Sequence, residues 1–139
     1  MFSRPIRILV VDDDPEFRHL LKENLHRAGN CRVITEKGAS MGGWIARCPW
    51  HKPDVILLDI RMPKTNGLEL LKILKTHHNT SDIPVIMLTA VDDDIIRSEA
   101  QSLRCADYIV KPIPTADLVE RIEKILPPAP PAQEKEPTP

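Results

Sequence analysis

The stretch PDVILLD, residues 53–59, decides the fold. Its four middle residues are all apolar, and Asp59 follows them directly. Strands that are apolar on both sides occur in parallel sheets, because helices cover both faces of such a sheet. The stretch therefore predicts a buried parallel strand that delivers an acid to its carboxyl end.

Similar short apolar runs alternate with amphipathic segments along the chain. We predict strands at residues 6–11, 32–35, 55–58, 84–89 and 108–110. Helices are predicted at residues 16–28, 40–47, 68–76, 93–103 and 115–126. In the first helix, Phe17, Leu20, Leu21 and Leu25 share the face expected to be buried. Five βα units in succession predict a doubly wound α/β fold, with a parallel sheet and helices on both faces.

Length and composition exclude several classes of protein. The 139 residues fit a single domain, and 19 basic against 20 acidic side chains give a formal charge of -1. No net positive field would attract nucleic acid or anionic membranes. No apolar run approaches the roughly 18 residues of a membrane span, and no secretory leader pattern precedes the first strand. We therefore expect a cytoplasmic protein that contacts neither nucleic acid nor membrane.

The composition changes after residue 126. Residues 127–139 hold six of the 14 prolines and no large apolar side chain. Such a segment favours extended polyproline II structure and has nothing to contribute to a core. We expect a domain at residues 1–126, followed by a proline-rich linker or tail.

Polar residues follow four of the predicted strands. Three acids, Asp12, Asp13 and Asp14, follow the first strand, and Asp59 follows the third. Thr89 and Lys111 end the fourth and fifth. Ligands of open parallel sheets bind beyond the carboxyl ends of the strands, so these groups are expected to meet there. Asp14 also has a purely structural explanation. It precedes Pro15, and an acid before a proline is typical of a helix N-cap.

These acidic, hydroxyl and amine groups together suit the binding of a metal ion and a phosphoryl group. Clustered carboxylates repel one another unless a cation joins them, and Mg²⁺ prefers oxygen ligands while keeping several of its waters. A lysine and a hydroxyl can bind the oxygens of a phosphoryl group beside the metal. One carboxylate can then act as a nucleophile and form an acyl phosphate.

The sequence resembles the receiver domain of two-component response regulators over roughly residues 6–126. The matching motifs are ILVVDDDP (8–15), PDVILLDIRMP (53–63), NG (66–67), PVIMLTA (84–90) and DYIVKP (107–112). The resemblance implies the flavodoxin-like strand order 2-1-3-4-5. It also implies a signalling domain rather than a turnover enzyme, phosphorylated by a sensor histidine kinase or a phosphotransfer protein.

The resemblance also implies roles for individual residues. Asp59 would be the phosphoacceptor. Asp13 and the backbone carbonyl of Arg61 would bind Mg²⁺ together with Asp59, with Asp12 assisting. Thr89 and Lys111 would bind phosphoryl oxygens, and Tyr108 would move inward on phosphorylation. The face formed by the fourth helix, fifth strand and fifth helix would then control an effector domain, a partner or a second copy of the chain. A cis peptide is expected before Pro112.

Two segments depart from the family pattern. The family commonly has Gly-Ala before its last strand, whereas this chain has Leu103-Arg104-Cys105-Ala106, so Arg104 would be strained if a positive φ were required. The segment around Trp44 and Trp50 is also unusual. Both rings are expected to cover edges of the core, and an exposed patch at Trp50 that binds a partner is the alternative.

Two other functions stay open. Asp12-x-Asp14 after an apolar strand is also the nucleophile motif of haloacid dehalogenase-type phosphatases, although that reading leaves Asp59 without a role. A phosphorylation-independent adaptor could use the same fold, although it would have no reason to keep clustered carboxylates. The glycine-rich phosphate loops GxGxxG and GxxxxGK[ST] are absent from the sequence, which argues against a nucleotide-binding fold.

Overall fold

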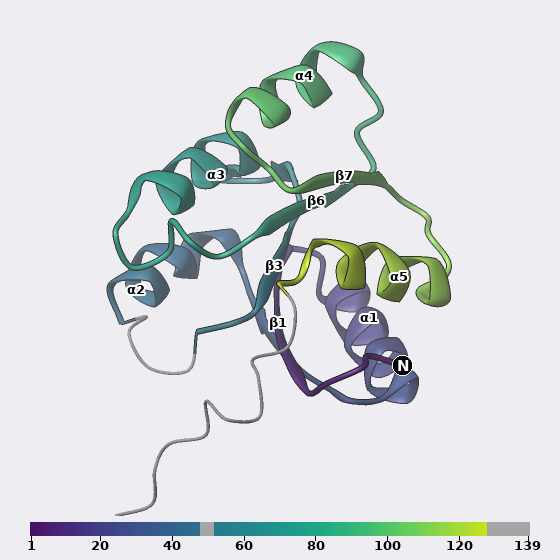
Figure 1. Cartoon of the computed structure of the whole chain (residues 1–139). Coiled ribbons are helices and arrows are strands. Elements are labelled where there is room, and N and C mark those ends of the chain that lie inside the picture. The colour runs from purple at the N-terminus through teal and green to yellow at the C-terminus, as the bar shows by residue number, and fades with distance from the viewer. Residues whose placement is uncertain (48–51, 128–139) are drawn as a thin grey trace, which may run out of the picture.

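The computed structural model describes residues 1–47 and 52–127. Its main sheet is parallel, in the order β2-β1-β3-β6-β7 (Figure 1). The strands are β1 (Ile6–Val11), β2 (Cys31–Glu36), β3 (Val55–Leu58), β6 (Val85–Thr89) and β7 (Asp107–Val110). A separate hairpin joins β4 (Arg61–Met62) to β5 (Thr65–Asn66). With the hairpin set aside, the order is the expected 2-1-3-4-5, so the predicted fold class is confirmed.

Helices cover both faces of the sheet. Figure 1 shows α1 (Pro15–Ala28) and α5 (Thr115–Ile125) on one face. On the other lie α2 (Met41–Ala46), α3 (Gly67–Thr76) and α4 (Asp94–Ser102), and a short 3-10 turn at Gly38–Ser40 precedes α2. Each face has its own apolar core, because alternate residues of β1 point to opposite sides. No helix among the described residues has the length and apolar character needed to cross a membrane.

The central strand behaves as its sequence predicts. None of the four residues of β3 is more than 1% exposed. It lies between β1 and β6, with Leu57 opposite Val10 on one side and Ile86 on the other. Both faces of this strand are therefore packed against side chains, and its carboxyl end opens at the middle of the sheet edge.

Two of the special backbone conformations were expected from the sequence, at Arg104 and before Pro112. The α1 helix stops at Gly29, whose φ is 88°, and Asn30 follows it with a φ of 65°. Arg104 adopts a φ of 69° in the turn before β7, the position where a glycine would carry no steric penalty. The Lys111-Pro112 peptide is cis.

The predicted burial of Leu20 is wrong. Leu20 is 56% exposed, because it lies at the edge of the apolar stripe of α1, outside the contact with the sheet. Ile73 on α3 is 50% exposed. Ile95 on α4 is 80% exposed. Trp44 is partly buried against the core, as predicted. Trp50 and the proline-rich segment from residue 128 onward lie outside the described residues.

Candidate functional site

Polar groups from four strands meet at the carboxyl edge of the sheet. The backbone pairing continues one residue past each strand: Asp59 N–H donates to the Val11 carbonyl at 3.0 Å, and Lys111 N–H to the Thr89 carbonyl at 2.8 Å. Asp12 N–H donates to the Glu36 carbonyl at 3.1 Å. The sheet itself therefore fixes these residues beside one another, as the sequence predicted.

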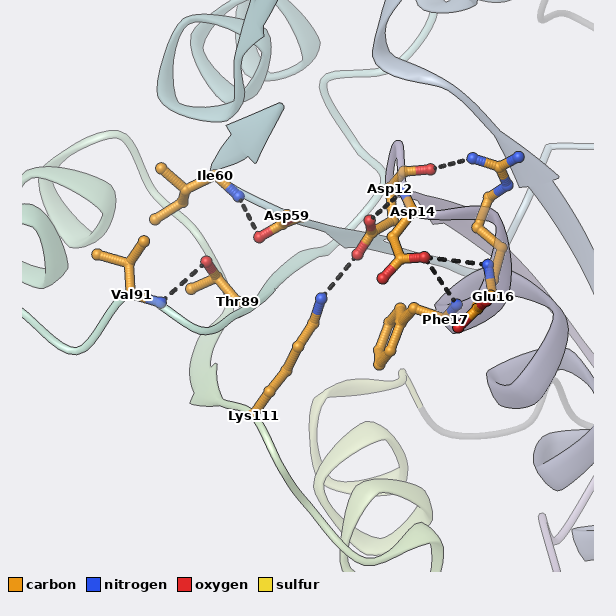
Figure 2. Close-up of polar contacts among 10 residues, drawn as sticks. Asp12, Asp14, Glu16, Phe17, Asp59, Ile60, Thr89, Val91 and Lys111 are labelled. Carbon is orange, nitrogen blue, oxygen red and sulfur yellow. Dashed lines mark hydrogen bonds and ion pairs between the residues drawn. The ribbon is translucent and has the colours of Figure 1, made fainter. Parts of the chain in front are cut away.

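A partly buried ion pair joins Lys111 and Asp12, the two outermost of these groups. Lys111 Nζ lies 2.7 Å from Asp12 Oδ2, and the two side chains are only 19% and 5% exposed. The other Asp12 oxygen accepts the Asp14 N–H at 2.9 Å. The Lys111 ammonium also lies 3.6 Å from the centre of the Phe17 ring. Figure 2 shows the lysine reaching from β7 to the acid after β1.

Asp59 occupies the centre of the site. It is 9% exposed, and its Oδ1 accepts the Ile60 N–H at 2.8 Å. Burial raises the pKa of Asp59 above its ordinary value, and the nearby Asp12 charge raises it further. The Thr89 hydroxyl and the Lys111 ammonium act in the opposite direction without cancelling the effect of burial. Neutralisation of this carboxylate by a cation would therefore be favourable.

The acidic triplet after β1 has three different environments. Asp14 caps α1, since its Oδ1 accepts the N–H groups of Glu16 and Phe17 at 3.0 and 3.3 Å. The Asp13 Oδ1 accepts the Gly38 N–H at 2.8 Å, which ties β1 to the turn before α2. Asp12 is the buried member, at 3% exposed. The predicted capping role of Asp14 is thus observed.

These side chains line a pocket of about 620 Å³, called here the acceptor pocket. Its lining includes every strand-end residue singled out from the sequence, together with Arg61. It also includes Asp92 and Asp93, which sequence reasoning missed. Both follow β6 closely, so their position after a strand end was the available signal. Asp93 has a structural role as well, because its side chain caps α4.

The donor set of the acceptor pocket fits a hard cation. No three His, Cys, Asp or Glu side chains within residues 1–47 and 52–127 are already arranged as a metal-binding group. Instead, both oxygens of Asp12 and one oxygen of Asp13 already bind protein partners. Mg²⁺ needs only one or two carboxylates, because it retains waters and accepts carbonyl ligands. Asp13, Asp59 and the Arg61 carbonyl are therefore chemically suitable, with Asp12 beside them.

Thr89 and Tyr108 are linked through one backbone residue. The Thr89 side chain is fully buried, and its hydroxyl accepts the Val91 N–H at 3.2 Å. Tyr108 is 4% exposed, and its hydroxyl donates to the Val91 carbonyl at 2.6 Å. The Arg97 guanidinium lies 4.7 Å from the centre of the Tyr108 ring. The structure therefore already holds Tyr108 in the inward position that was expected on phosphorylation, and any displacement of Thr89 would act on the same peptide segment.

Comparisons with known proteins agree with this geometry. The family model described as "Response regulator receiver domain" matches residues 8–123. The transcriptional regulatory protein CpxR of Escherichia coli K12 is 39% identical over 120 residues, which cover 86% of this chain and 49% of CpxR. Protein PilH of Pseudomonas aeruginosa is 34% identical over 120 residues, covering 86% of this chain and 97% of PilH.

A solved structure gives the same result. The BeF3-activated N-terminal receiver domain of RstA from Klebsiella pneumoniae superposes with a TM-score of 0.74 at 32% identity, covering 85% of this chain and 96% of that one. The chain spans about half the length of CpxR and of several other curated relatives. From the matched family model, the identity to these relatives and the shared fold, we conclude that the chain belongs to the family of response regulator receiver domains.

Proposed function

We propose that Asp59 is the phosphoacceptor of this receiver domain. A carboxylate oxygen of Asp59 attacks the phosphorus of a phosphohistidine on a sensor kinase or phosphotransfer protein. The new O–P bond forms as the N–P bond breaks, and the bonding pair leaves with the imidazole nitrogen. The single observation that carries this proposal is the position of Asp59, a buried carboxylate at the pocket's centre with a raised pKa.

The neighbouring groups suit the charge that develops during transfer. Lys111 supplies a fixed positive charge from β7, close enough to lower the pKa of Asp59. Thr89 supplies a hydroxyl at the end of the adjacent strand β6. Phosphoryl transfer depends mainly on positioning and on neutralising the oxygens of the transferred group. Lys111 and Thr89 are therefore proposed to bind those oxygens.

A divalent cation completes the proposed site. Asp13, Asp59 and the backbone carbonyl of Arg61 would hold Mg²⁺, with Asp12 assisting. When bound, the cation would neutralise the carboxylates and the incoming phosphoryl oxygens. Asp13→Ala should weaken Mg²⁺ affinity far more than the neighbouring control Asp14→Ala, as measured by isothermal titration. Equal losses in the two variants would contradict the assignment.

Phosphorylation is proposed to act on partners through Thr89 and Tyr108. A phosphoryl group that draws the Thr89 hydroxyl away from the Val91 N–H would change the segment that also binds the Tyr108 hydroxyl. The face of α4, β7 and α5 would respond, because Tyr108 lies on β7 beneath α4. Thr89→Ala should leave Asp59 able to accept phosphate but make partner binding insensitive to it. Normal phosphorylation dependence in that variant would refute this route.

We further propose that residues 1–126 form the signalling domain and that residues 127–139 begin a linker or tail. CpxR and PhoB are named transcriptional regulatory proteins, and this chain matches about half of each. An effector domain, a separate partner or a second copy of the chain would read the α4, β7 and α5 face. We expect these events to take place in the cytoplasm, without direct contact with nucleic acid or membrane.

Intact mass spectrometry after treatment with acetyl phosphate tests the acceptor role. One labile phosphoryl group should be added in Mg²⁺ and none in chelator, and Asp59→Asn should remain unlabelled. Labelling of Asp59→Asn at the parental level would overturn the assignment. Sustained hydrolysis of an aryl phosphate that depends on Asp12 would favour a haloacid dehalogenase-type phosphatase instead. Absence of any label in Mg²⁺ would favour a phosphorylation-independent adaptor.

A further inference from the structure

The edge of the sheet opposite the acceptor pocket carries a basic pocket of about 570 Å³. It lies at the amino ends of β1, β2 and β3, and the charged side chains in its lining are Arg4, Arg7, Arg32, Lys52 and Asp54. Four cations and one carboxylate leave a strong positive excess there, although the chain as a whole carries a formal charge of only -1. This local excess is not explained by the proposed phosphorylation chemistry.

Two of the arginines are held side by side by the sheet. Arg7 of β1 is the register partner of Arg32 of β2, and both side chains are exposed. Neighbouring strands are about 4.8 Å apart, so these like charges repel each other unless solvent or an anion separates them. The backbone therefore presents a preformed pair of guanidinium groups.

The protein supplies little compensation for this charge. Within the described part of the chain, Lys52 pairs with Asp82 at 3.2 Å, but no carboxylate forms an ion pair with Arg4, Arg7 or Arg32. The one acid in the pocket lining, Asp54, accepts the backbone N–H of Arg7 with its Oδ2 at 2.8 Å rather than pairing with a guanidinium group. Arg4 Nη2 donates to the Pro127 carbonyl at 3.4 Å, and the three guanidinium groups otherwise keep their donors for an external partner.

We propose that the basic pocket binds a compact anion that carries two or more phosphate groups. Arginine presents a planar fork of donors that matches the oxygens of phosphate in pairs. The close spacing of Arg7 and Arg32, with Arg4 on the same rim, favours several negative charges within a small volume. The pocket volume lies within the range of small-molecule sites. The site is independent of Asp59, because it lies at the other end of the strands.

Inorganic pyrophosphate is the probe for this proposal. Titration of the full chain in magnesium-free buffer at constant ionic strength, followed by calorimetry and amide chemical shifts, should show saturable binding with shifts at the starts of β1 and β2. Arg7→Gln and Arg32→Gln should each weaken binding about tenfold, since a hydrogen bond to a charged group contributes roughly that much. Asp59→Asn should bind as the parent does. Circular dichroism of each variant establishes that it is folded.

Arg27→Gln is the matched control, because Arg27 is an exposed arginine that does not line the basic pocket. It removes the same charge and should leave pyrophosphate affinity within about twofold of the parent. Equal weakening by Arg27→Gln, or unchanged binding by folded Arg7→Gln and Arg32→Gln, would overturn the proposal. Citrate bound as tightly as pyrophosphate would overturn the assignment to phosphate chemistry.

Discussion

Gly67→Ala should displace the very residue proposed to accept phosphate. Gly67 begins α3, and its N–H donates to the Ile60 carbonyl at 2.8 Å. A methyl group at this position would collide with the backbone oxygen of Asp59 and would lie 2.6 Å from the Ile60 Cα. Ordinary contacts begin near 3.4 Å, so the two backbones would have to separate by about 1 Å.

The cost can be placed at the upper end of the range for overpacking, about 3 kcal/mol, because both colliding groups are backbone rather than flexible side chains. For a domain of this size, that corresponds to a fall of roughly 10 °C in the unfolding midpoint. Displacement of Asp59 should also slow labelling by acetyl phosphate, because the acceptor would lose its alignment with Lys111 and Thr89.

Gly42→Ala is the matched control for this prediction. Gly42 lies in α2 with nothing within 4 Å of the position of the added methyl group, so the change should stabilise the protein by about 0.5 to 1 kcal/mol. Urea unfolding and labelling rates of the two variants give the comparison. If Gly67→Ala were as stable and as readily labelled as the parent, the close packing of α3 against the end of β3 would be refuted.

Three further variants test separate contacts. Burial raises the Asp59 pKa, so the native state binds the carboxyl proton more tightly than the unfolded chain does, and the free energy of unfolding falls as pH rises from the unfolded to the native pKa. In metal-free buffer, Asp59→Asn should therefore be more stable than the parent at neutral pH. Urea unfolding should show that this advantage is lost below about pH 3.9. Asp14→Ala should cost about 1 kcal/mol in the same assay, as expected for loss of an exposed N-cap, and a neutral result would contradict the capping role. Tyr108→Phe should lower stability by about 1 to 3 kcal/mol, since it leaves the Val91 carbonyl without its donor at a buried site; an unchanged midpoint would show that the bond is dispensable.

The sequence was informative wherever the sheet imposes position. The run before Asp59 predicted a strand buried on both faces, which the structure confirms, and parallel strands deliver their following residues to one edge. The sequence alone therefore places Asp12, Thr89 and Lys111 around Asp59. The turn before β7 was also anticipated, because the positive φ expected at Arg104 is observed.

Features that depend on residues far apart in the chain could not be predicted from the sequence. The bond from the Gly38 N–H to Asp13 joins residues 25 positions apart, and no local pattern distinguishes it from a free carboxylate. The β4–β5 hairpin has two residues in each strand, too few for a periodic signal. Leu20 has the spacing of a core residue and is exposed, since periodicity defines a stripe but not where its contact with the sheet ends.

Chemical mapping of the phosphorylated residue tests the central claim most directly. The protein is treated with acetyl phosphate and Mg²⁺, and borohydride then reduces the acyl phosphate, converting the labelled aspartate to homoserine. Peptide mass spectrometry should find homoserine at residue 59 and unmodified aspartate at residues 12 and 13. Homoserine at residue 12 or 13, with residue 59 intact in a protein that carries the phosphoryl label, would contradict the proposal that Asp59 is the acceptor.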